Sequence, residues 1–382
     1  MTQKDYLSSL RELRRALHRK PEIAGEESAT AVRIKEFLHP YGPDRIVENI
    51  GGYGMIAEFS SGKPGPTVMF RCELDALPIE EKNNIPYSSS IRGKAHLCGH
   101  DGHMSMVAGL ARYLKERRPD KGRVLLLFQP SEENGQGADK MLKDPALHEF
   151  SPDYIFAIHN LPGFPLHRVV LSNGYFAAAS RGMIIRLTGK SSHAAEPEKG
   201  INPALSMAKL IKSFYDILKV RDHFKDFVLI TPIHARLGTL AYGTSPGEAV
   251  IHLTLRSYLD EDMNLLTSSI EQLIKTITRK GKVVAHIAYE EIFPATRNDA
   301  ECTRIVKQAG LESGLEVDYL DQPFRWSEDF GHFTSNYRGV LFGLGSGIDQ
   351  PALHNPDYDF PDDLLPTGIE IFRKIYRFIL ND

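Results

Sequence analysis

The sequence predicts a two-domain α/β protein in which a compact second domain is inserted into the first. At 382 residues the chain is longer than one hydrophobic core usually organises. Short apolar runs alternate with helix-like stretches at both ends of the chain, and this pattern is typical of a sheet covered by helices. The intervening segment has a different order of elements. We therefore expect one domain from residues 1–175 and 293–382, and a second from 176–292.

The first domain begins with two helices. Leu7, Leu10, Leu13 and Leu17 recur at three- and four-residue spacing until Pro21, which predicts an amphipathic helix that ends there. The remaining elements predicted for this domain are a helical stripe at 32–38, strands at 54–59, 67–71, 124–129 and 154–159, a helix at 104–114, a helix at 299–313, a strand at 339–344 and a closing helix at 365–379.

The inserted segment is predicted to form a two-layer domain of its own. Its expected elements are a strand at 181–189, a helix at 203–219, strands at 226–238 and 248–257, a helix at 262–279 and a strand at 282–291. This order is βαββαβ, the ferredoxin-like arrangement of one sheet and two helices.

Composition limits the partners of the protein. The formal net charge is −3 with acidic and basic residues interleaved, so no field draws the chain to nucleic acid or to an anionic membrane. Cys72, Cys98 and Cys302 are too few for a disulfide framework, which indicates a reducing compartment. The polar N-terminus has no apolar signal core. We expect a cytoplasmic protein that acts on a small molecule.

Polar side chains follow three of the predicted strands where each strand ends. Asp75 comes after the strand at 67–71, Glu132 and Glu133 follow the strand at 124–129, and His159 ends the strand at 154–159. Ligands of open α/β sheets gather at the carboxyl ends of strands. A buried carboxylate or imidazole without a partner costs several kcal/mol, so these residues predict one shared pocket.

A dense cluster of potential metal ligands lies in the loop before the helix at 104–114. A thiolate at Cys98 and an imidazole at His100 can reach the same ion, because Gly99 and Gly102 allow a tight loop. Asp101 is a candidate to orient His100 by a hydrogen bond. Taken singly, a lone histidine or cysteine is more often an ordinary core or surface residue.

The Glu132–Glu133 pair suits a metal-dependent hydrolase. One carboxylate would bind metal while its neighbour accepts a proton from water, and the sequence leaves open which does which. His354 offers one more imidazole in a loop that belongs to the first domain.

Seven ordered motifs resemble the M20 metallopeptidases, and within them the amidohydrolase branch of hippurate hydrolases, auxin-conjugate hydrolases and N-acyl amino acid deacylases. The matching motifs are Leu17-His18-Arg19-Lys20-Pro21-Glu22, Asp75-Ala76-Leu77-Pro78-Ile79, Cys98-Gly99-His100-Asp101-Gly102-His103, Glu132-Glu133, Gly189-Lys190-Ser191-Ser192-His193-Ala194, Ser327-Glu328-Asp329-Phe330 and Leu353-His354-Asn355-Pro356. The resemblance spans nearly the whole chain. It implies a metal-dependent exopeptidase-like catalytic domain whose inserted domain serves as a lid and dimerises.

The resemblance also implies roles for individual residues. It makes Glu132 the general base, and it implies that His193 reaches the pocket of a partner subunit and stabilises the oxyanion. The implied ligands of two divalent ions are Cys98, His100, Glu133, His159 and His354, with Cys98 bridging. Zinc or manganese suits this mixed donor set, and cobalt or nickel is also compatible. For the free carboxylate of the substrate, the candidate partner is Arg256 on a strand of the inserted domain.

The sequence departs from the pattern of this branch at three places, which affect the bracing of a loop and the preference for substrate. Glu73 stands where the branch has Asp, which is expected to alter how the neighbouring loop is braced. The segment 243–249 lacks the Asn-Val-Ile-Pro stretch of relatives, whose Asn helps hold the substrate. Trp326 precedes Ser327 and places a bulky indole beside a motif residue.

The predicted function is metal-dependent hydrolysis of the amide bond of small N-acyl amino acids by a homodimer. One alternative is a dipeptidase or carboxypeptidase with the same metal site. The other is a non-catalytic metal-dependent binding protein, which has no use for the spare carboxylate at Glu132.

Overall fold

A computed structural model describes residues 2–219 and 223–381, and contacts within the chain divide it into two units. Unit 1 comprises the chain up to Phe176, Thr296–Pro323 and the chain from Asp329 on, and unit 2 comprises Ala177–Ala295 and Phe324–Glu328. Three parts of the predicted domains lie outside the described residues. They are residues 1 and 382 of the first domain and residues 220–222 of the inserted domain.

The predicted boundaries at residues 176 and 292 differ from those of the units by one and three residues, and one further segment falls in a different unit from the predicted one. Residues 324–328 were expected in the first domain, but they belong to unit 2. The reason is main-chain pairing: Ala177 forms a bridge with Phe324, and the amide of Ala178 donates to the carbonyl oxygens of Phe324 and Trp326.

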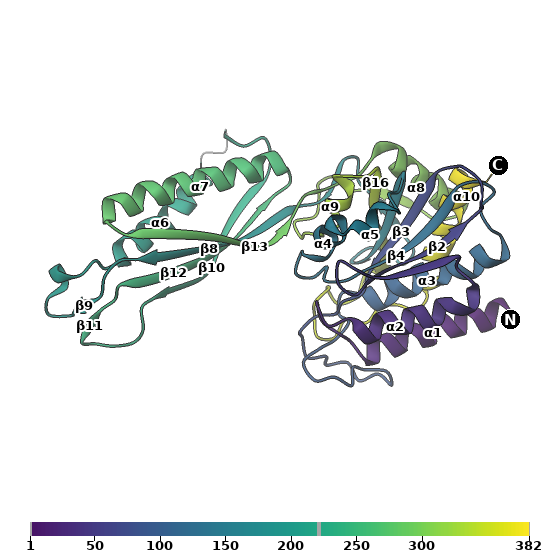
Figure 1. Ribbon diagram of the computed structural model, residues 1–382, viewed down its shortest axis with the longest axis horizontal. Coiled ribbons are helices and arrows are strands. Elements are labelled where there is room, and N and C mark those ends of the chain that lie inside the picture. Colours follow the sequence, from purple (N-terminus) through teal and green to yellow (C-terminus); the bar gives the residue numbers. More distant parts are fainter. Residues whose placement is uncertain (1, 220–222, 382) are drawn as a thin grey trace. The chain divides into compact units, whose positions relative to one another are not determined.

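Unit 1 is built on a mixed sheet whose central strands are parallel (Figure 1). In the described part of this unit the sheet has eight strands in the order β1 (Arg45–Ile50), β2 (Gly54–Ser60), β4 (Arg123–Gln129), β3 (Thr67–Glu73), β5 (Tyr154–Pro162), β16 (Gly339–Gly347), β6 (Val169–Leu171) and β15 (Val317–Tyr319). Strands β4, β3, β5 and β16 run parallel to one another. Their carboxyl ends therefore lie at one edge of the sheet.

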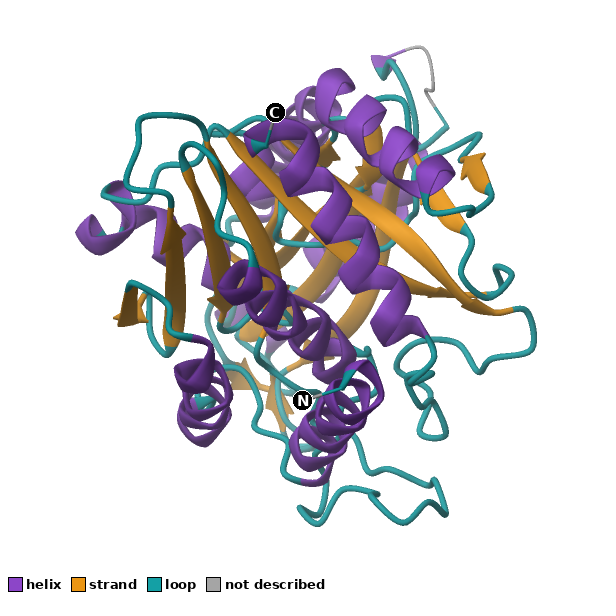
Figure 2. Cartoon of the chain, turned by 90° about the vertical axis from the view of Figure 1, so that its right-hand side faces the viewer, coloured by secondary structure: helices purple, strands orange, loops and turns teal. Residues whose placement is uncertain are grey.

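Helices cover this sheet, and Figure 2 shows them packed across its strands. The longer ones are α1 (Gln3–Arg19), α2 (Ser28–Leu38), α3 (His100–Glu116), α8 (Ala300–Glu312) and α10 (Leu364–Leu380), and the shorter elements are α4 (Gly137–Lys143), α5 (Pro145–His148), α9 (Gly331–Thr334), η1 (His39–Tyr41), β7 (Tyr175–Ala177) and β14 (Thr296–Arg297). Thr2 and Asp5 form a capping box at the start of α1. The mixed α/β fold predicted from the sequence is confirmed.

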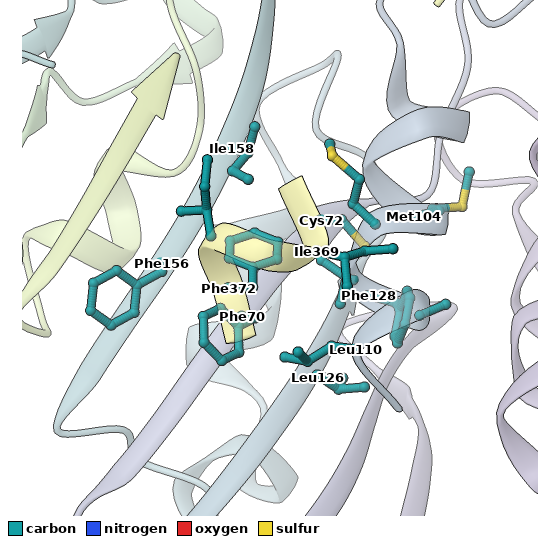
Figure 3. Packing of buried hydrophobic residues seen from close by; sticks show 14 of the residues in the cluster. Phe70, Cys72, Met104, Leu110, Leu126, Phe128, Phe156, Ile158, Ile369 and Phe372 are labelled. Carbon is teal, nitrogen blue, oxygen red and sulfur yellow. The ribbon is translucent and has the colours of Figure 1, made fainter. Parts of the chain in front are cut away.

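The core of unit 1 lies between α3, α10 and the central strands. Phe372 of α10 packs on Phe70 of β3 with ring centroids 4.7 Å apart, and Phe156 of β5 lies 5.8 Å from Phe70 (Figure 3). All three side chains are buried. Their burial, at about 25 cal/mol per Å² of apolar surface, holds α10 against the sheet. Helix α10 in turn packs against α3.

Unit 2 contains an antiparallel sheet with helices α6 and α7 packed against it. Its elements in chain order are β8 (Ala179–Thr188), β9 (Ser192–His193), η2 (Pro197–Lys199), α6 (Ala204–Ile217), β10 (Val228–Leu237), β11 (Thr244–Ser245), β12 (Glu248–Ser257), α7 (Asp260–Gly281) and β13 (Val284–Phe293). The main sheet has the order β10-β12-β8-β13, and β9 pairs with β11 in a separate two-stranded ribbon. Figure 1 shows this ribbon beyond one end of the main sheet.

The two faces of the unit 2 sheet differ in polarity. On β12, Leu253 and Leu255 are buried, whereas His252, Thr254 and Arg256 alternate with them and are half-buried. An alternation of this kind places apolar side chains against the helices and polar ones on the opposite face.

Among the described helices, none has the length and apolar character needed to cross a membrane.

Candidate metal centre and active site

Helix α3 begins at one of the predicted ligands. Gly99 caps the helix with φ of +94°, a left-handed conformation that favours glycine. A side chain there would also overlap the amide group of Asn160. This tight entry turns Cys98 and His100 toward the carboxyl ends of the parallel strands. The sequence placed the start of this helix at residue 104, one turn too late.

The structure brings the five predicted ligands together within unit 1. Cys98 Sγ lies 3.6 Å from His159 Nε2, His100 Nε2 lies 3.8 Å from Glu133 Oε1, and His354 Nε2 lies 3.7 Å from Glu133 Oε2. The donor atoms of Cys98, His100 and His159 all lie within 4.8 Å of one another, and so do those of Cys98, Glu133 and His354. The two groups of three share the thiol of Cys98.

These residues fit a pair of divalent cations. A cation bound at about 2.0–2.3 Å separates its donor atoms by roughly 3.3–3.7 Å, which is close to the distances above. His100 Nε2 is buried, and it has no hydrogen-bond partner among the described residues. Burial lowers the pKa of His159 to about 3 and also lowers the pKa values of His100 and His354. Neutral imidazole is the form that binds metal.

Glu132 faces the same cluster from its edge. Its Oε2 atom lies 3.9 Å from His100 Nε2, and its Oε1 atom accepts a hydrogen bond of 3.3 Å from the amide of Asp329. The side chain is 7% exposed. A carboxylate held in this way beside the predicted ligands is placed to exchange a proton with water.

Asp75 positions three of the residues around it. Its carboxylate accepts hydrogen bonds from the amides of Glu132 and Glu133 at 3.0 and 2.9 Å, and its main-chain oxygen lies 2.8 Å from His100 Nδ1. Burial raises the pKa of Asp75 to about 7, an effect that the nearby Glu27 adds to and the amide donors oppose. Asp75 therefore holds the backbone of the Glu132–Glu133 turn and the ring of His100 in place.

Asp101 does not orient His100, contrary to the expectation from their adjacency. Its Oδ2 atom lies 3.1 Å from Arg14 Nη1 and 2.9 Å from His18 Nδ1, and its Oδ1 atom accepts from the amide of Gly102. The backbone of α3 turns the Asp101 side chain toward α1. The Asp101 carboxyl group is buried there, which alone would raise its pKa. Arg14 and His18 outweigh burial, so the pKa of Asp101 lies below its ordinary value. Asp101 ties α1 to the start of α3.

Glu73 and His103 form a buried layer behind the ligands. His103 Nδ1 lies 2.8 Å from Glu73 Oε2, and His103 Nε2 lies 2.6 Å from Asn160 Oδ1. The ring of His103 is 4.9 Å from that of His159. The departure at Glu73 thus provides a carboxylate that braces a motif histidine and also pairs with Arg71.

Sequence reasoning missed a second buried network beside Glu132. Asp329 accepts hydrogen bonds from Arg71 Nη2 and Gln129 Nε2 at 2.8 Å and from the amide of Ala138 at 2.9 Å. Since the amide of Asp329 donates a hydrogen bond to Glu132, this network helps to hold the carboxylate of Glu132 in place. The polar residues within the apolar strands β3 and β4 were the signal that could have revealed it.

Two residues of the site adopt a left-handed backbone without being glycine. Ser131 has φ of +55° and His354 has φ of +67°, and such strain is typical of functional positions. Glu27, which lies in no motif that the sequence singles out, accepts hydrogen bonds from the amide and hydroxyl of Ser131 at 2.8 and 3.1 Å. It thereby supports the turn that leads into Glu132.

The predicted residues His193 and Arg256 belong to unit 2. His193 is exposed on β9, and its Nδ1 accepts a hydrogen bond of 3.1 Å from the amide of Ala195. Arg256 Nη1 donates to the main-chain oxygen of Arg325 at 2.7 Å and to Ser327 Oγ at 2.9 Å. Trp326, between these two residues, stacks on Phe324 with ring centroids 4.7 Å apart.

Comparisons with known proteins show which family the chain resembles over most of its length. A family model described as Peptidase family M20/M25/M40 matches residues 69–377. The N-acetyldiaminopimelate deacetylase of Bacillus subtilis (strain 168) is 28% identical over 377 residues, which are 97% of this chain and 98% of that protein. The hippurate hydrolase of Campylobacter jejuni is 28% identical over 373 residues, which are 97% of this chain and 96% of that protein.

A solved structure has the same fold. The crystal structure of the Bacillus subtilis YXEP protein, described as a dinuclear metal-binding peptidase from the M20 family, superimposes with a TM-score of 0.84 at 24% identity. The match covers 99% of each chain.

Proposed function

Because the chain belongs to peptidase family M20/M25/M40 and is a metal-dependent amidohydrolase, we propose that it hydrolyses the amide bond of small N-acyl amino acids. The observation that carries this proposal is the gathering of sulfur, imidazole and carboxylate donors around one point, beside the buried carboxylate of Glu132. The relatives named as deacetylase and hippurate hydrolase support an acyl group such as acetyl or benzoyl.

The proposed ligands of two divalent ions are Cys98, His100, Glu133, His159 and His354. Divalent ions in such a site lower the pKa of water and polarise a carbonyl group. Glu132 accepts the proton of the attacking water and later donates it to the leaving amine. Asp75 and the Asp329 network keep Glu132 and its neighbours in fixed positions during these transfers.

His193 is proposed to stabilise the tetrahedral oxyanion from a partner subunit. It lies on the ribbon next to the start of β12, since β9 pairs with Thr244 of β11. Arg256, the proposed partner of the substrate carboxylate, lies eight residues along β12 from Glu248, a span of roughly 26 Å at 3.3 Å per residue. A small substrate cannot contact both on one chain, which supports a site completed by two subunits.

Arg256 keeps the capacity to bind a carboxylate. In the described part of the chain its hydrogen bonds use Nη1 alone, so Nε and Nη2 remain for a substrate. Burial lowers its pKa, and Glu291 opposes that effect, but a guanidinium stays charged at neutral pH.

We further propose that unit 2 serves as lid and dimerisation domain in a cytoplasmic homodimer.

Metal analysis of the purified protein, combined with a panel of acetyl and benzoyl amino acids and dipeptides, tests the function. We expect about two zinc or manganese ions per chain and turnover of N-acyl amino acids. Turnover of dipeptides alone would identify an exopeptidase instead, and metal binding without any turnover would identify a binding protein.

The Glu132→Gln variant tests the base. The substitution keeps the size of the side chain and removes the proton acceptor, so turnover should fall about 10²- to 10⁴-fold with metal content unchanged. Glu312→Gln, at an exposed position on α8, is the matched control. Activity that survives in Glu132→Gln would assign the base role elsewhere.

A further inference from the structure

A pocket in unit 2 carries two arginines that the proposed mechanism does not use. It has a volume of about 360 Å³ and lies where the main sheet meets the β9–β11 ribbon. Its polar lining includes Arg186, Arg236, Thr188, Ser191, Thr244 and Glu248. Small residues such as Gly238, Ala241 and Gly247 make up much of the remaining lining.

The register of the sheet aims both arginines at the same side. Val250 of β12 pairs with Arg186 of β8 and with Arg236 of β10, and directly paired residues of neighbouring strands point to the same face. Two strand spacings separate the arginines by about 10 Å at the backbone. Extended guanidinium side chains can therefore converge over Val250 on one anion.

The pocket has excess positive charge. In the described parts of the chain, 2–219 and 223–381, neither Arg186 nor Arg236 forms an ion pair or a side-chain hydrogen bond. Glu248 adds one carboxylate to the lining, and it pairs in register with Thr188 rather than with an arginine. His286 of β13 continues the row beyond Arg186. Two like charges that face one space repel each other, and an anion between them removes that cost.

We propose that this pocket binds a carboxylate of the substrate, so that the preferred substrates carry an anionic group besides the free carboxylate of the amino acid. The proposal rests on the proposed function. Guanidinium forks match the planar geometry of a carboxylate. The pocket lies next to His193, the residue proposed to stabilise the oxyanion, because Thr244 lines the pocket and pairs with His193. Arg256, at the other end of β12, is too distant to bind the same group.

Matched substrate pairs test the proposal with metal-loaded enzyme. N-acetylglutamate is compared with N-acetylglutamine, and N-succinylalanine with its terminal amide, so that each pair differs by one charge. The ratio of kcat/KM for the acidic member to that for the neutral member should exceed ten in one of the pairs. Arg186→Gln and Arg236→Gln should each lower that ratio about tenfold, the size of one lost charge-assisted hydrogen bond.

Arg279→Gln is the matched control, because Arg279 is exposed in the last turn of α7 and should leave the ratio as in the wild type. A wild type without charge preference, or a ratio that both arginine variants leave unchanged, overturns the proposal. Activation by inorganic phosphate that disappears in these variants, without a change in the ratio, also overturns it and assigns the pocket to a free anion.

Failure of the proposed function gives a different result. If no N-acyl amino acid is hydrolysed, calorimetry measures the affinity of the protein for glutarate and for its monoamide directly. Glutarate binding that weakens at least tenfold in the double variant Arg186→Gln/Arg236→Gln supports a carboxylate site, and equal binding of the two compounds to the wild type refutes it.

Discussion

Asp75 contacts three residues of the proposed site, two through its side chain and one through its main-chain oxygen. Its side chain accepts hydrogen bonds from the amides of Glu132 and Glu133, and its main-chain carbonyl oxygen faces the ring of His100. Groups that orient metal ligands in this way usually contribute 10- to 100-fold to metal affinity.

We expect Asp75→Asn to weaken metal binding by about that factor, because one carboxylate oxygen becomes an NH₂ group facing a backbone N–H. Competition with a chromophoric chelator measures the affinity. Asp318→Asn, which perturbs an ion pair with Arg168, is the control. Wild-type affinity in a folded Asp75→Asn protein would show that the main-chain oxygen alone suffices.

His18 should make stability depend on pH between about 6.5 and 9. Burial lowers its pKa, but hydrogen bonds to Asp101 and Glu81 outweigh that effect and raise the pKa to about 9. Because the folded value lies above the ordinary 6.5, the stabilisation is complete below pH 6.5 and is lost as the pH rises through 9. The loss should be on the order of 3 kcal/mol.

Urea unfolding of the metal-saturated protein from pH 6 to 9.5 measures this dependence. His18→Gln should flatten the curve, whereas His39→Gln, at an exposed position, should follow the wild type. A wild-type midpoint that does not fall across this range would contradict a charged His18 in the folded state.

The sequence predicts some of these residues and not others for a physical reason. Cys98, His100, Glu132 and Glu133 lie in short local motifs at strand or helix ends, so chain order alone places them at one edge of a sheet. The partners of Asp101 come from α1, 83 and 87 residues away. Pairing at such separations depends on how helices pack, which no local pattern encodes.

At the scale of elements, α3 is the helix on which the site depends most. It carries His100 at its first position and packs closely on the C-terminal part of unit 1, where a side chain at Gly102 would overlap the ring of Phe360. The same helix approaches α10 at Gly109, where an added Cβ would overlap Ile369.

Gly102→Ala should therefore destabilise the protein by about 1–3 kcal/mol, despite the better helix propensity of alanine. Gly310→Ala in α8 is the comparison, because its added Cβ would lie 3.3 Å from Val169, and we expect a change near zero. Thermal unfolding of both variants measures the difference. Equal stability of the two would mean that Phe360 moves aside at little cost.

Periodicity predicts the long elements well and the short ones poorly. The strand at 248–257 has the predicted limits, and α10 begins one residue early. The three-residue strands β6 and β15 were not predicted, because three residues are too few to show an alternation. The first turn of α3 was missed because Gly99 and Gly102 interrupt its apolar pattern.

At the scale of the whole molecule, the proposed dimer predicts that two inactive variants restore activity when their subunits are mixed. Glu132→Ala and His193→Ala should each be inactive, but a mixture that exchanges subunits should regain activity, because a mixed dimer holds one complete site. Random pairing at equal concentrations should give about a quarter of the wild-type rate.

The control is a mixture of His193→Ala with the double variant, in which no complete site can form. Absence of recovery in the first mixture, with exchange demonstrated by mass spectrometry, would place His193 outside the active site or in the same chain's pocket.

The insertion of unit 2 has a consequence for biosynthesis. Strand β16 lies between β5 and β6 in the sheet, yet it emerges from the ribosome some 170 residues later than β6. The nascent chain must therefore keep a gap in its first sheet while the whole of unit 2 is translated. Since His354 follows β16, an emerging chain lacks one of the proposed metal ligands until that segment has been translated. Premature termination would release a polypeptide with exposed strand edges, which quality-control proteases should remove.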